Sequence, residues 1–365
     1  MIPAIPQPDP LALPAPAWLL WILLLLTFFL HVIPMNLVLG GSIVGAIARV
    51  RGRRPDRRHE AELAHIIVKA MPVLISATVT LGVAALLFLQ VLYGRVFFVS
   101  AIVMGWWWLS VIGLLILTYY ASYLLAMREA SLGAAGTFLA WVIAAVAGLI
   151  ALIYGNNMTL MLKPAELVTR YAAAGSGVQL NLLDPALFPR HLHMVLGAIA
   201  VSGLAIAVLG VVRRKKDAAF GEWAIRYGAF FCTLATVVNI LAGLWWLAAL
   251  PRDVLLRFMG QDMRAIGELL AGILLTLTGA GHTVLAATGK RPVPMVTVGA
   301  VTLLAGIAMM LLTRDTIRRI TLESAGFQPV NWIAPQWGPI AIFAVLLVVA
   351  VGTVAWMTRA LATSR

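Results

Sequence analysis

The sequence predicts an all-α integral membrane protein, and three observations support this fold class. Apolar residues make up 62% of the 365 residues and charged residues only 11%, whereas soluble domains average about 45–50% and about 25%. The mean hydropathy is +0.97. Many apolar runs are longer than about 18 residues, which indicates membrane-spanning helices rather than the short alternating strands of a barrel.

About nine membrane-spanning helices are expected, forming a single transmembrane domain over residues 1–365. Their predicted ranges are 17–48, 64–92, 97–126, 132–154, 191–212, 222–249, 264–288, 293–312 and 338–359. The proline-rich N-terminal segment lacks the basic region of a cleavable signal peptide, so we interpret it as a short tail before the first span. Several ranges exceed the ~20 residues that cross a bilayer, which predicts tilted helices.

Basic residues predict the orientation of the chain in the membrane. The stretch RVRGRRPDRRHE after the first span carries six arginines, RRKK follows the fifth span, and KR follows the seventh. All three lie on the same side of a nine-span chain, and the positive-inside rule places that side in the cytoplasm. We therefore expect a multi-pass protein of the bacterial inner membrane with a periplasmic N-terminus and a cytoplasmic C-terminus. The net charge of +13 then reflects topology, and no nucleic-acid partner is expected.

Two connections on the predicted outer side, residues 155–190 and 313–337, are long enough for a surface helix and a loop. In the second, Arg314, Arg318 and Arg319 share one helix face, and Asp315 precedes Arg319 by four residues. Two interpretations are open. The segment is a solvated helix with an i,i+4 ion pair, or its arginines clamp anionic groups such as haem propionates.

The histidines are functional candidates because ionisable groups inside a bilayer are costly. A zinc site needs three or four close ligands, but the chain has one cysteine, Cys232, and no HExxH or CxxC motif. It also has no CxxCH motif, so it attaches no c-type haem itself. Haem iron needs only one or two axial ligands, typically His or His with Met. Isolated histidines on separate spans therefore favour b-type haem.

His31 has a favourable local setting near the middle of the first span. Pro34 removes a backbone N–H and can kink the helix, and Met35 shares the face of His31 at i+4. Gly40 and Gly41 follow, and small residues allow a neighbouring helix or a flat macrocycle to approach closely. We predict that His31 ligates haem iron; the alternative is a histidine that only hydrogen-bonds to a neighbouring helix.

His191 and His193 open the fifth span. They lie about 200° apart on a helix, so they cannot both face the same interior. His193 is deeper and is followed by Gly197 at i+4, so we predict His193 as the haem ligand. His191 and Arg190 would then lie near the interface, available to propionates or solvent. The alternative is that both histidines are interfacial polar residues.

The seventh span carries a stripe at helical spacing that includes Glu268, Gly272 and His282. This stripe fits a haem wall, a proton path or close helix packing, and His282 is a third candidate haem ligand. His65, at the start of the second span, is its candidate partner. Lys69, one turn after His65, suits a quinone head group or a lipid contact. Glu268 and Lys69 are the candidates for proton transfer.

This pattern resembles subunit I of the cytochrome bd quinol oxidases. That family has nine spans, an outer N-terminus and haem-ligating histidines in the first and fifth spans, which His31 and His193 match in order. Its long quinol-binding loop after the sixth span corresponds here to the 13 residues LPRDVLLRFMGQD. Its methionine ligand in the seventh span has no evident counterpart, and His282 is the candidate there. The resemblance implies haem b, a quinol substrate and a respiratory complex.

The expected function is therefore that of a haem b subunit of a respiratory electron-transfer complex, with two haems or three. It would pass electrons between the quinone pool and a periplasmic partner, such as a c-type cytochrome or another subunit, as part of a quinol-oxidising oxidoreductase. Oxygen reduction stays open. Two alternatives remain: a proton- or ion-coupled transporter or channel subunit, and a non-catalytic membrane anchor.

Overall fold

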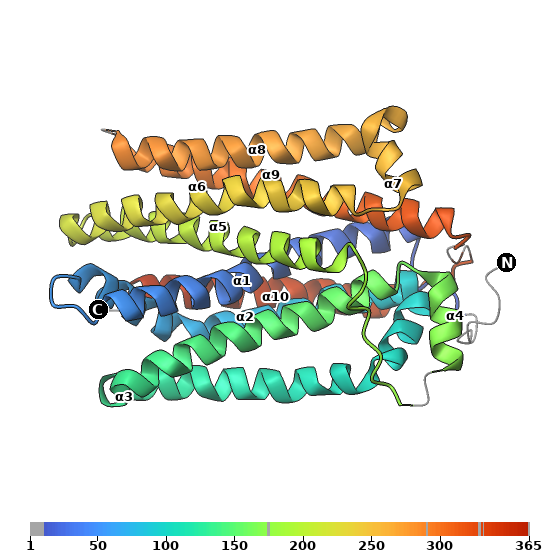
Figure 1. Ribbon diagram of the computed structural model, residues 1–365, viewed down its shortest axis with the longest axis horizontal. Helices are drawn as coiled ribbons and strands as arrows, with labels where there is room; N and C mark the ends of the chain where they lie inside the picture. Colours follow the sequence, from blue (N-terminus) through green and yellow to red (C-terminus); the bar gives the residue numbers. More distant parts are fainter. Residues whose placement is uncertain (1–10, 174–175, 290, 328–329, 331, 364–365) are drawn as a thin grey trace.

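The computed structural model describes residues 11–173, 176–289, 291–327, 330 and 332–363, and its long helices run roughly along one axis (Figure 1). The elements are α1 (Ala17–Arg51), α2 (Arg58–Val103), α3 (Gly105–Leu160), α4 (Pro164–Ala172), α5 (Leu187–Arg213), α6 (Ala218–Ala248), α7 (Arg252–Leu256), the π-helix η1 (Arg257–Gln261), α8 (Met263–Thr288), α9 (Pro292–Ser324) and α10 (Trp337–Thr363). In the described residues, strand-like pairing is confined to one isolated bridge between Leu13 and Ile333. The predicted all-α class is confirmed.

Eight helices of the described chain are long and apolar enough to cross a membrane, and one of them crosses the bundle twice. Within α3, Arg128 (φ −118°) and Gly133 (φ +45°) leave the helical region. Glycine tolerates such a positive φ because it has no Cβ. The two halves of α3 run in opposite directions (Figure 1), so these helices provide nine crossings, as the sequence predicted.

The predicted break between the second and third spans is wrong by about ten residues. Residues 93–96 were expected to form the connection, but α2 kinks at Tyr93 (φ −128°, ψ 21°) and continues to Val103. This continuation is helical because Val96, Phe97 and Val99 are buried in an apolar cluster with α1. The true connection is the single residue Met104, between α2 and α3.

The basic connections lie together at one end of the bundle. The α1–α2 and α5–α6 connections, and the adjoining ends of α8 and α9, are at the left of Figure 1, whereas α4 and α7 are at the right. The helix α1 begins at the α4 end and α10 finishes at the opposite end. This arrangement agrees with the predicted grouping of basic loops, and the assignment of that end to the cytoplasm stays a prediction.

The arginine segment at residues 314–319 is part of α9, which continues to Ser324, and is not a separate surface helix. Asp315 is only 1% exposed; it accepts hydrogen bonds from Trp21 Nε1 at 2.6 Å and Arg318 Nη2 at 2.7 Å. Arg319 Nε lies 3.5 Å from the same carboxylate, which is the expected i,i+4 pair. The ion pair is thus present, but the interpretation of a solvated helix is wrong because the segment is packed into the bundle.

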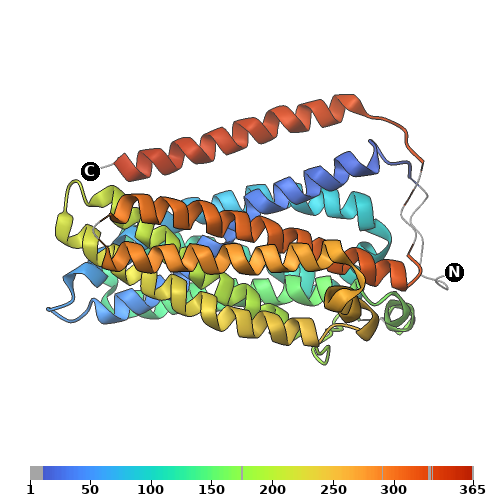
Figure 2. The same cartoon turned by 90° about the horizontal axis from the view of Figure 1, so that it is seen from above.

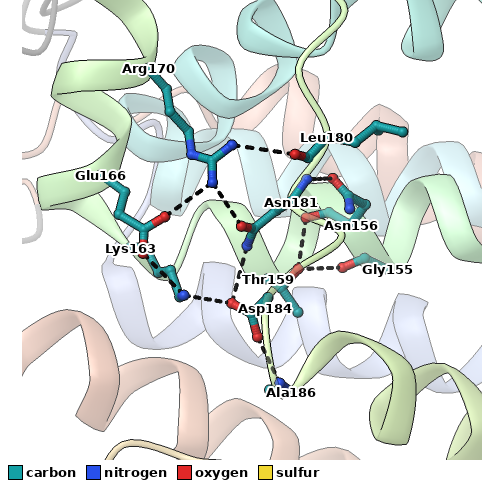
Figure 3. A network of polar contacts seen from close by, with 10 residues as sticks. All are labelled: Gly155, Asn156, Thr159, Lys163, Glu166, Arg170, Leu180, Asn181, Asp184 and Ala186. Atoms are coloured by element: carbon teal, nitrogen blue, oxygen red, sulfur yellow. Dashed lines mark hydrogen bonds and ion pairs between the residues drawn. The ribbon is translucent and has the colours of Figure 1, made fainter.

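The outer segment 155–190 contains the expected short helix, α4, and a polar network ties it down (Figure 3). Lys163 Nζ lies 2.8 Å from Asp184 Oδ2 and 3.1 Å from Glu166 Oε1. Arg170 Nη2 donates to Asn181 Oδ1 at 3.0 Å. Burial alone would lower the pKa of Lys163, but its hydrogen bonds to Asp184 and Glu166 outweigh burial and raise the pKa. Lys163 therefore stays charged and holds the segment over the bundle end.

Close helix crossings bring the predicted ligand-bearing helices together. A Cβ added at Gly40 of α1 would lie 2.0 Å from the carbonyl oxygen of Ala198 on α5. One added at Gly203 of α5 would lie 2.4 Å from the backbone nitrogen of Cys232 on α6. In contrast, α10 lies along the outside of the bundle (Figure 2), where Phe343 packs edge-on against Phe88 of α2. The compact part of the fold therefore centres on α1 and α5.

Candidate functional site

His31 faces the interior between α1 and α2. Its Nδ1 lies 2.9 Å from the carbonyl oxygen of Thr78, a residue 47 positions away in the sequence. Gly82 stands directly beside the imidazole, and a Cβ at that position would lie only 2.7 Å from His31 Cε1. The ring thus occupies space that any other residue at position 82 would fill.

His193 has the same kind of setting between α5 and α6. Its Nδ1 lies 3.2 Å from the carbonyl oxygen of Asn239, 46 positions away. A Cβ added at Gly243 would lie 3.1 Å from both Cε1 and Nδ1 of this imidazole. The ring of Trp246 lies 5.8 Å away, centroid to centroid.

The two histidines therefore repeat one local arrangement. In each, Nδ1 contacts the carbonyl of a residue that precedes a glycine by four on the neighbouring helix, Thr78 with Gly82 and Asn239 with Gly243. A carbonyl only accepts, so Nδ1 is the donor and the neutral imidazole keeps a free lone pair on Nε2. Histidines that bind metals typically donate their other ring N–H in this way, which fixes the tautomer and the ring orientation.

Each histidine lines its own apolar cavity. The His31 cavity, of about 280 Å³, lies between α1, α2, both halves of α3 and the parts of α5 and α9 near the α4 end. The His193 cavity, of about 220 Å³, lies between α1, α5, α6, α8 and α9. The two cavities adjoin, because six residues line both of them: Phe28, Met35, Arg190, Met194, Leu311 and Arg314. A wall one side chain thick separates them.

Two arginines cover this shared wall at the α4 end. Arg190 is buried, and its Nε has no hydrogen-bond partner. The guanidinium of Arg314 lies over the Phe28 ring, 4.4 Å from its centroid. In the described part of the chain no ion pair joins Arg190 or Arg314 to a carboxylate, and Asp315, the carboxylate next to Arg314, pairs with Arg318 and Arg319. Buried cations are normally paired, so the geometry suits an anionic ligand.

The donor set fits b-type haem. Each cavity offers one oriented imidazole nitrogen with a glycine beside the ring, an apolar lining, and arginines suited to carboxylates. Methionine sulfur is the other common axial donor; Met35 and Met194 line both cavities, and Met310 lines the His193 cavity. The predicted role of Met35 as a ligand stays a prediction.

The other predicted histidines lie outside the residues that line the two cavities. His191 is partly buried near the start of α5, and its Nδ1 has no partner in the described structure. His282 is partly buried on α8, and its Nδ1 contacts the carbonyl of Thr278 in the same helix at 2.8 Å. His65 is exposed and contacts Glu129 Oε2 at 2.6 Å. The structure therefore does not bring His65 and His282 together as the sequence analysis suggested.

The two proton-transfer candidates also lie away from the cavities. Glu268 is buried on α8, where it accepts from Arg264 Nε at 2.9 Å and from Thr316 Oγ1 at 2.7 Å. Lys69 Nζ donates to the carbonyl of Ala126 at 2.6 Å. Both side chains thus have structural partners, and their roles in proton transfer stay predictions.

Substituting the glycines beside the histidines is expected to disturb one site at a time. In Gly82→Ala the new methyl group would push the His31 ring from Thr78, whereas in Gly243→Ala it would crowd His193. Each variant should lower the affinity for added haem about tenfold or more at its own site and spare the other, measured by haem titration of the purified protein. Gly148→Ala is the control, since nothing lies within 4 Å of its added Cβ. Equal loss at both sites would contradict this assignment.

A comparison with solved structures finds a protein of similar fold. No family model and no curated protein matches the sequence. The structure of bd oxidase from Geobacillus thermodenitrificans matches with a TM-score of 0.71, covering 96% of this chain and 99% of that chain at 13% sequence identity. The chain has the bd oxidase fold. The expected resemblance is thus confirmed at the level of the fold, and with it a multi-pass, helical membrane architecture.

Several features of this bd oxidase fold were outside the reach of sequence reasoning. Thr78 and Gly82 drew no attention because they look like ordinary residues of an apolar helix. A paired pattern of a polar residue and a glycine four apart, on the span after each candidate histidine, is the signal that could have found them. Met310 was also missed, because it lies in a long apolar run without other markers.

Proposed function

We propose that the protein is a haem b-binding subunit of a bd-oxidase-like respiratory complex in the bacterial cytoplasmic membrane. One observation carries the proposal: two histidines with the same Nδ1-to-carbonyl arrangement line adjoining cavities that share two unpaired arginines. This combination supplies an iron ligand and a carboxylate-binding group to each cavity. The bd oxidase fold supports the proposal because the matching protein is an oxidase.

Each group of residues would have its own role in binding haem. Bound haem supplies reversible one-electron chemistry. His31 and His193 would hold the iron through Nε2, and Thr78 and Asn239 would keep these rings oriented. Arg190 and Arg314 would hold the propionate groups. The thin wall of Phe28, Met35, Met194 and Leu311 keeps the two sites close together but separate, which suits electron transfer between them.

Two haems are proposed, one in each cavity. His282 is partly buried on α8 and lines neither cavity, so a third haem at this position would need further contacts from another subunit.

The proposed electron donor is quinol and the proposed acceptor is a periplasmic c-type cytochrome or another subunit. The chain has a single cysteine, Cys232, which is buried, so c-type haem must come from a partner. Such a partner would dock at the α4 end, where ion pairs of Lys163 and Arg170 hold α4 in place (Figure 3). Glu268 at this end would accept protons from quinol, and Lys69 would serve the opposite end.

A visible spectrum of the purified protein tests the proposal. We expect a reduced α-band in the b-type region and about two haems per chain by pyridine haemochrome assay, as two ligand-bearing cavities require. A transporter or a non-catalytic anchor predicts a colourless protein. A folded preparation that stays colourless when haem is supplied during expression would overturn the proposal.

A further inference from the structure

Arg190 and Arg314 are the charged residues common to both cavities. Each lines the His31 cavity and the His193 cavity, although they come from different helices, α5 and α9. Both also line a small space of about 20 Å³ at the α4 end, together with Trp246 and Arg318. The two side chains therefore border the same small space from different helices.

In the described residues no carboxylate lies within ion-pair distance of either guanidinium group. Asp315, the nearest acid on α9, is occupied by Arg318 and Arg319. Phe28 and Trp246 lie under the two guanidinium groups, with the cations 4.4 and 5.6 Å from the ring centroids. Aromatic faces stabilise cations only modestly. Most of the compensation must therefore come from what occupies the cavities.

Arg318 provides a useful contrast. It lines the His31 cavity but not the His193 cavity, and it has its own acid, Asp315, at 2.7 Å. Arg319 lines neither cavity. Among the arginines of the α4 end that the structure describes, only Arg190 and Arg314 line both cavities.

We propose that Arg190 and Arg314 act as one electrostatic unit for both haem sites, so that the two midpoint potentials are set together. This inference rests on the proposed function. Two haems bring four propionate carboxylates to two shared cations, and charges in a low-dielectric interior interact over longer distances than in water. The positive charge of this unit favours the reduced state at both sites, so a change in that charge shifts both potentials in the same direction.

The test is an equilibrium redox titration of the full-length protein, followed in the visible region. Removing one positive charge destabilises the reduced state at each site, so Arg314→Gln should lower both midpoint potentials. We expect a change in each one-electron equilibrium on the order of tenfold, about 59 mV. Arg314→Lys keeps the charge and should retain values near those of the parent. Arg319→Gln, on the same helix, is the matched control and should leave both unchanged. His31→Ala and His193→Ala assign each midpoint to a cavity.

The outcomes separate this inference from the function on which it rests. A parent protein without haem would refute the proposed function. If Arg314→Gln and Arg190→Gln bind haem but lower only one midpoint potential or neither, the inference is overturned and the proposed function still stands. An arginine variant can also lose haem. Loss of both haems, while Arg319→Gln keeps its full haem content, supports a pair of arginines that serves both sites. Loss of a single haem contradicts it.

Discussion

Replacing His31 or His193 with alanine is expected to halve the haem content of the purified protein. Each imidazole offers one free Nε2 to its own cavity, and no second histidine lines either cavity. The cavity that keeps its histidine also keeps the shared arginines, so its haem should remain bound. The double variant should be colourless. The haem content is measured by pyridine haemochrome assay, and difference spectra of each variant identify the haem that is lost.

His191→Ala is the matched control for this experiment. His191 lies two residues before His193 on α5 but lines neither cavity, so its loss should leave the spectrum unchanged. His31→Gly and His193→Gly add a second check, because free imidazole can enter the space left by the side chain and restore the lost band. If both single variants retain full haem content, the two histidines are not ligands.

The membrane architecture could be read from the sequence because its cause is local. A bilayer requires long apolar helices, and each span meets this requirement within its own residues. The errors occurred where tertiary packing decides the outcome. The sequence around Tyr93 resembles the end of a span, yet α2 continues because Val96 and Phe97 find apolar partners on other elements.

The site was predictable only in part, for the same reason. His31 and His193 stand out in their own helices, but the carbonyls that orient them lie 47 and 46 residues away. The sequence left Arg314 either on a solvated surface helix or in a clamp for anionic groups, whereas α9 continues through this segment without a break and places Arg314 between two cavities. No local pattern reveals that Asp315 accepts a hydrogen bond from Trp21, a residue 294 positions away.

Gly40→Ala is expected to destabilise the whole protein and to weaken both haem sites. The added Cβ would lie 2.0 Å from the carbonyl oxygen and 2.3 Å from the carbonyl carbon of Ala198. These are backbone atoms of α5, so no side-chain rotation can relieve the clash and the two helices must separate. Overpacking typically costs about 1–3 kcal/mol, occasionally more, and this site belongs at or above the upper end. A large fall in the thermal unfolding temperature in detergent is the expected result.

The loss of haem should follow because α1 and α5 together build the shared wall. Separating them moves Met35 away from Met194, and His31 away from Arg190, so both cavities change shape at once. Gly41→Ala is a stringent control: it introduces the same methyl group one residue later, where the nearest atom is Ser202 Oγ at 3.8 Å. Alanine also favours the helix by about 1 kcal/mol over glycine, so Gly41→Ala should be neutral or slightly stabilising. Equal stability and haem content in the two variants would mean that α1 and α5 do not cross at Gly40 in the membrane.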